Sequence, residues 1–109
     1  MIVNSKILGQ LKPTSGTLGL LYIVPNAKES QGIIVCCNQA TTKDHIHIGF
    51  VKSGDNPNLT QQFVCFNTAV PANGVLEKSF DLGPDESLYV YSLNGTSSFV
   101  ATGLEISNV

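Results

Sequence analysis

The sequence predicts an all-β domain, an antiparallel β-sandwich of about eight short strands with jelly-roll or immunoglobulin-like topology. Short runs rich in Val, Ile, Phe, Tyr and Thr are separated by proline or glycine throughout the 109 residues. No stretch carries an apolar stripe at the 3.6-residue spacing of a helix over a helical length. At this length we expect one domain over residues 1–109, in which residues 1–10 could form an N-terminal arm.

The first two predicted strands cover residues 6–9 and 17–24, two runs that end close to Pro13 and Pro25. Proline has no backbone N–H to give to a strand ladder, so it bounds both runs. The third predicted strand, residues 32–38, contains "IIVCC", which is apolar at five consecutive positions. Both faces of that strand are therefore apolar.

The fourth predicted strand, residues 45–51, alternates in "DHIHIGF". Ile46, Ile48 and Phe50 fall on one face, and the two histidines fall together on the other. This pattern is typical of a strand with one face in the core.

The second half of the chain carries the remaining strands. "FVCF" is apolar at four consecutive positions, and "LYVY" places Leu88 and Val90 on one face with Tyr89 and Tyr91 on the other. Asn94-Gly95 suits a tight turn between the last two strands and predicts a terminal hairpin. The predicted strands are residues 61–67, 75–82, 87–93 and 98–106.

Composition narrows the function classes. Charged residues make up 13% of the chain, against roughly 25% in average soluble domains, and the net charge is −2. All six basic residues are Lys, so the chain lacks the Arg forks that read phosphate and guanine, and we expect no nucleic-acid partner. No apolar run is long enough to span a bilayer, and the N-terminal residues do not resemble a signal peptide. We therefore expect no membrane partner and a cytoplasmic site of synthesis.

The three cysteines lie in apolar runs, where Cys behaves as a small hydrophobe. Cys36 and Cys37 are adjacent, so at least one of the three thiols stays unpaired. A bridge from Cys36 or Cys37 to Cys65 is the alternative to three free thiols.

The sequence predicts no enzyme, no catalytic residues, no metal site and no cofactor. His45 and His47 could begin a transition-metal site, but no third ligand is identifiable, so we predict exposed strand histidines. Cys65 could be paired with either histidine as a nucleophilic dyad, but no motif connects them.

Several segments together resemble a family of small β-sandwich virion structural proteins of tailed, cyanophage-like bacteriophages. They are "KILGQLKP", "TLGLLYIVP", "IIVCCNQATT", "AVPANGVLEKSFDLGPDESLYVYS" and "GTSSFVATGLEIS", in this order over nearly the whole chain. The resemblance implies a capsid decoration or cement protein, or a neck or tail accessory protein. It also implies localisation in the virion after assembly in the host cytoplasm.

Strands with two apolar faces need a second covering layer, and a neighbouring subunit supplies one most economically. We therefore expect a homo-oligomer that also binds other virion proteins, such as major capsid or neck and tail proteins. The alternative is a host-surface glycan-binding module of a tail or fibre, although the chain has no Trp platform. The predicted interface residues are Tyr89, Tyr91, Phe63, Cys65, Ile7 and Leu8.

Overall fold

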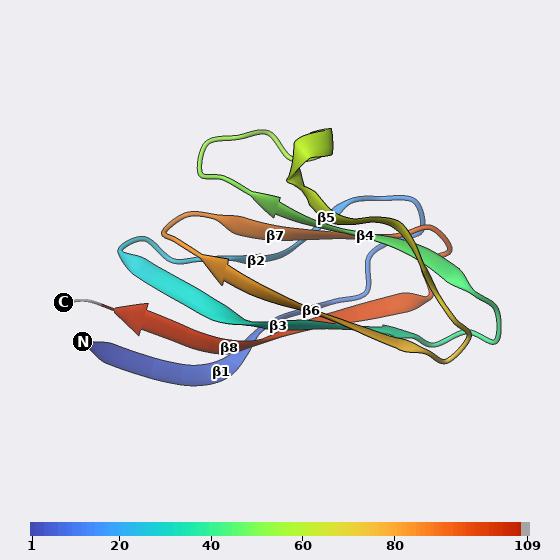
Figure 1. The fold of residues 1–109 in the computed structure, drawn as a ribbon, viewed down its shortest axis with the longest axis horizontal. Coiled ribbons are helices and arrows are strands. Elements are labelled where there is room, and N and C mark those ends of the chain that lie inside the picture. Colours follow the sequence, from blue (N-terminus) through green and yellow to red (C-terminus); the bar gives the residue numbers. More distant parts are fainter. Residues whose placement is uncertain (108–109) are drawn as a thin grey trace.

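The computed structural model describes residues 1–107 and consists of two four-stranded antiparallel sheets packed face to face (Figure 1). All eight predicted strands are present, so the predicted fold class is confirmed. A single 3-10 turn, η1 (Thr60–Gln62), lies in the connection between the fourth and fifth strands in this part of the chain. The strands are β1 (Ile2–Leu11), β2 (Gly19–Ile23), β3 (Lys28–Asn38), β4 (Asp44–Val51), β5 (Phe63–Val70), β6 (Val75–Leu82), β7 (Ser87–Ser92) and β8 (Ser97–Ser107).

The order of the strands distinguishes the two topologies that the sequence left open. The sheets run β1-β8-β3-β6 and β2-β7-β4-β5. Only the connection from β4 to β5 joins neighbours within one sheet, and every other connection between described strands crosses to the opposite sheet. An immunoglobulin fold keeps its first two strands side by side in one sheet, whereas here β1 and β2 lie in different sheets. The fold is a jelly roll.

The predicted terminal hairpin is wrong. Asn94-Gly95 does form a turn, with Gly95 at a φ of 70° and its N–H donating to the Ser92 carbonyl at 3.4 Å. However, β7 and β8 belong to different sheets, so the turn carries the chain across the sandwich instead of pairing the two strands.

The core lies between the two sheets. Side chains alternate between the two faces of each strand, and those that point inward fill the core. In β7, Leu88 and Val90 are fully buried while Tyr89 and Tyr91 face outward and are half-buried, as the alternation predicts. Phe99 of β8 is the largest fully buried side chain among the described residues. The other fully buried apolar side chains are Val24, Ile34, Cys36, Ile46, Ile48, Val70 and Ala101.

Residues 1–10, which could have formed an arm, belong almost entirely to β1. This strand pairs with β8 from Ile2 opposite Ser107 to Leu11 opposite Phe99. The pairing shifts register between Ile7 and Gly9, where β1 bulges. The N-terminal segment therefore forms one edge of its sheet, along the lower border of Figure 1.

A buried carboxylate, that of Asp44, joins the sheets at one end of the sandwich. Its Oδ2 accepts hydrogen bonds from the hydroxyls of Ser92 on β7 and Ser97 on β8, the latter at 2.6 Å. Its Oδ1 accepts the backbone N–H groups of His45 and Asn94 at 2.9 and 3.0 Å. Burial alone would raise the pKa of Asp44, but these four donors outweigh it and hold the pKa below its usual value.

A second buried carboxylate, that of Glu105 on β8, joins the sheets near the chain ends. The Tyr22 hydroxyl donates to its Oε2 at 2.6 Å, and the ammonium of Lys6 lies 2.8 Å from its Oε1. Burial opposes ionisation of Glu105, but the Lys6 and Tyr22 hydrogen bonds keep its pKa lowered. Burial and the Glu105 carboxylate raise the pKa of Tyr22 to about 12.

Two glycines allow β3 and β8 to approach closely. Gly32 and Gly103 face each other in the ladder. A Cβ on Gly32 would overlap the Thr102 carbonyl oxygen, and one on Gly103 would overlap the Gln31 carbonyl oxygen. Neither position accepts a side chain without separating the strands.

Candidate functional site

The outer face of the β2-β7-β4-β5 sheet carries the most distinctive surface in the described part of the chain. Four ring side chains meet there, and we call them the aromatic cluster: His47 of β4, Phe63 and Phe66 of β5, and Tyr91 of β7. Phe66 is 63% exposed. A single exposed apolar side chain is ordinary, but rings gathered into one exposed patch are typical of a surface that binds another molecule.

His47 lies at the centre of the aromatic cluster. Its ring is stacked between those of Phe66 and Tyr91, with both pairs of centroids 4.3 Å apart and interplanar angles of 3° and 12°. Phe63 meets the edge of the stack, 5.3 Å from His47 and 5.4 Å from Phe66. Its ring also covers Gly49, which has no side chain to displace it. The cluster is therefore a packed unit held in place before any partner binds.

A bulge in β5 makes this packing possible. The β4–β5 ladder pairs Ile46 with Thr68 and Ile48 with Cys65, so two residues of β5 lie opposite His47. One of the two is Asn67, which has a φ of 51° and donates its backbone N–H to Nδ1 of His47 at 2.8 Å. The same bulge leaves Phe66 on the outer face.

That hydrogen bond also shows which ring nitrogen of neutral His47 carries the proton. Nδ1 can accept the N–H only when it carries no proton, so the proton of the neutral ring lies on Nε2. Burial between the neighbouring rings lowers the pKa of His47 from its usual value.

The structure brings together three of the six predicted interface residues. Tyr89, Tyr91 and Phe63 share the outer face of the β2-β7-β4-β5 sheet, where Leu20 opposite Tyr89 extends the apolar surface. Cys65 lies in the core instead, because the bulges in β5 turn its side chain inward. Two other predicted residues lie on β1 in the opposite sheet, Ile7 with 60% exposure and Leu8 packed against the core.

The sequence interpretation missed Phe66 and His47 as members of this surface. Asn67 was the signal in the sequence that could have indicated the bulge in β5. Asn adopts a positive φ more readily than most other residues with a Cβ, and such a φ is common at a bulge.

His45 and His47 are half-buried, not exposed as predicted, and within residues 1–107 they gather no further ligands. No group of three His, Cys, Asp or Glu side chains that could hold a metal ion occurs within residues 1–107. Cys36, Cys37 and Cys65 are all free thiols, and burial raises the pKa of Cys36 to about 11. No helix in the described residues has the length and apolarity to cross a bilayer.

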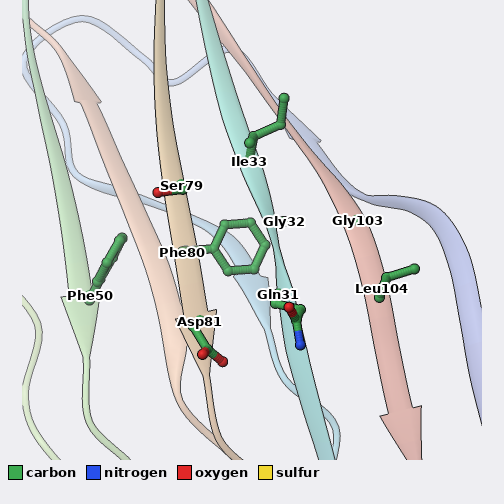
Figure 2. A pocket seen from close by; sticks show the side chains of 9 residues that line it. All are labelled: Gln31, Gly32, Ile33, Phe50, Ser79, Phe80, Asp81, Gly103 and Leu104. Atoms are coloured by element: carbon green, nitrogen blue, oxygen red, sulfur yellow. The ribbon is translucent and has the colours of Figure 1, made fainter.

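An open hollow of about 720 Å³ lies beside the Gly32–Gly103 pair. Figure 2 shows Phe80 directed from β6 toward β3, with Ile33 and Leu104 on the neighbouring strands. Asp81 is the one titratable side chain among its nine lining residues. The hollow thus offers a shallow apolar surface with one carboxylate at its border.

Comparison of the chain with protein-family models, with curated proteins and with solved structures gives no match.

Proposed function

We propose that this protein is a non-enzymatic structural subunit of a phage particle that binds other particle proteins through the aromatic cluster. The observation that supports this proposal is the exposed ring of Phe66 on a prepacked stack with His47 and Tyr91. Its role in a particle, as a capsid decoration or cement protein or a neck or tail accessory, rests on the sequence resemblance.

The physical argument starts from what the cluster gains on burial. Aromatic side chains bury roughly 150–250 Å² each, and their apolar area contributes about 25 cal/mol per Å² removed from water. Because the stack and the Asn67 hydrogen bond already hold the rings, little side-chain entropy is lost when a partner covers them. A rigid aromatic centre of this kind is typical of the residues that dominate binding energy in protein interfaces.

The test compares substitutions of two residues that are similarly exposed and lie on opposite sheets. Phe66→Ser removes the outermost ring of the cluster, and Val75→Ser removes an exposed apolar side chain from β6. Binding to particles assembled without the protein is measured by cosedimentation. We expect Phe66→Ser to weaken binding at least about tenfold, a loss of about 1.4 kcal/mol, and Val75→Ser to bind like the wild type. Equal binding by both variants and the wild type would refute the proposal.

A second candidate function is binding of a host-surface glycan by the same cluster. The exposed ring of Phe66 supports it, since a flat aromatic face beside polar groups can stack on a sugar, and His47 Nε2–H supplies a donor nearby. The jelly roll occurs in both viral capsid and lectin domains and so favours neither candidate. Saturable binding on a glycan array that Phe66→Ser abolishes would favour the glycan module.

A further inference from the structure

Strand β1 presents an open edge. It pairs with β8 on one side, and no described strand lies on the other. Every residue from Ile2 to Ile7 is exposed, including Val3 at 47% and Ile7 at 60%. An edge of this kind offers a row of backbone N–H and C=O groups to an incoming strand.

The other sheet edges are protected by their sequences or shapes. Strand β6 carries Glu77, Lys78 and Asp81, strand β5 contains two register shifts, and strand β2 has only five residues. Charges, bulges and short length each discourage pairing with another chain. Strand β1 has ten residues, no proline and one charge, Lys6, whose ammonium is held by Glu105. Its regular part runs from Ile2 to Ile7, before the bulge.

We infer that β1 pairs antiparallel with β1 of a second copy of this chain, with Ser5 of each copy opposite Ser5 of the other. The inference uses a different sheet from the aromatic cluster and does not depend on the proposed function. The two sheets would join into one continuous eight-stranded sheet across a two-fold axis.

Symmetry restricts the register. When two identical strands pair antiparallel around a two-fold axis perpendicular to the sheet, one residue must lie opposite its own copy. We call the residue that lies opposite its own copy the centre of the pairing. A centre at Lys6 would place two ammonium groups face to face, and with a centre at Ile7 the pairing would extend across the bulge. A centre at Asn4 would place Val3 opposite Ser5 and Ile2 opposite Lys6.

A centre at Ser5 avoids these mismatches. It places Val3 of one copy opposite Ile7 of the other, twice by symmetry, and Lys6 opposite Asn4. Val3, Ser5 and Ile7 share the face of β1 opposite to that of Lys6, because successive side chains alternate. Val3 and Ile7 of both copies therefore gather on one face of the joined sheet. Apolar cross-strand pairs of this kind stabilise the pairing of two strands.

Disulfide trapping tests the register. Cysteines are introduced in a Cys37→Ser background, because Cys36 and Cys65 are buried. Ser5→Cys should form a covalent dimer on oxidation, since opposite residues lie within disulfide reach. Val3→Cys and Ile7→Cys should each stay unlinked alone, because four residue steps separate a residue from its own copy by roughly 13 Å. A mixture of these two variants should form a linked dimer.

Gln10→Cys, an exposed position on β1 beyond the bulge, is the control and should not cross-link. The wild type should scatter light as twice the 11.6 kDa chain mass. Val3→Lys should halve that mass, whereas Ile33→Lys, on a sheet face away from the edge, should leave it unchanged. A wild-type mass of 11.6 kDa, or equal cross-linking of Ser5→Cys and Gln10→Cys, would overturn the inference. Neither result would bear on particle binding by the aromatic cluster.

Discussion

Replacing Asp44 by Asn should destabilise the fold by about 2–4 kcal/mol at pH 7. The substitution keeps the shape and one acceptor oxygen, but it puts an amide NH₂ group where Oδ2 now accepts the hydroxyls of Ser92 and Ser97. Each hydrogen bond to a charged acceptor contributes about 1.5–3 kcal/mol, and new N–H···O contacts to the hydroxyls recover part of the loss. The total stability of a domain is roughly 5–15 kcal/mol, so this change is large but leaves a folded protein to measure.

The assay is urea unfolding at pH 7, where the midpoint should fall while the slope stays constant. Asp55→Asn is the matched control, because Asp55 lies exposed in the β4–β5 connection and its loss should change stability by less than about 0.5 kcal/mol. An Asp44→Asn variant as stable as this control would refute the view that the carboxylate stabilises the junction of the sheets.

The pH dependence of the unfolding free energy tests the same carboxylate in a second way. The folded-state pKa of Asp44 is lowered, so its contribution is fully present above the unfolded pKa of about 3.9 and is lost as pH falls through the folded pKa. In that interval the unfolded chain binds a proton that the folded chain excludes, and stability rises with pH. The difference between wild type and Asp44→Asn should therefore shrink on acidification. A constant difference from pH 7 to pH 2 would contradict the assignment.

Three further outcomes are expected. Tyr22→Phe should lower stability by about 2 kcal/mol at pH 7, because it removes the hydrogen bond to Glu105. This deficit should vanish as pH rises from 10 through about 12, because wild-type Tyr22 ionises there. A deficit that persists at that pH would count against the bond. Gly32→Ala should lower stability by about 3 kcal/mol in urea unfolding, and a neutral result would show that β3 and β8 can separate freely. The His47 ring should titrate below 6.5 by NMR, and Phe66→Ala should raise that midpoint by uncovering one ring face; an unchanged midpoint would argue against burial as the cause.

Local patterns were sufficient to predict that the eight strands exist and roughly where each one lies, but not where every strand begins and ends. The run over residues 75–82 matches β6 at both ends, because Asn73-Gly74 and Gly83-Pro84 bound it with residues that break a ladder. The predicted strand over residues 6–9 was too short, since polar Asn4 and Ser5 precede it. Those residues are strand because β8 supplies their ladder partners from the other end of the chain.

Pairing and orientation depended on information that local patterns lack. Asn94-Gly95 shows that the chain turns, but turn chemistry does not reveal whether the next strand lies beside the previous one or in the opposite sheet. The outward direction of Phe66 and inward direction of Cys65 follow from bulges that shift the alternation of β5. The aromatic cluster could thus be predicted only in part, as Tyr91 and Phe63.

The central position of β8 has a consequence for how the protein is made. This strand is the last of the eight to leave the ribosome, yet it lies between β1 and β3 and pairs with both. Until it emerges, the nascent chain holds two strands without their shared neighbour, and the non-local ladders that close the sheet cannot form. Folding of this sheet must therefore follow synthesis of β8. Any chain interrupted before that point would present β1 and β3 as unpaired edges prone to aggregation.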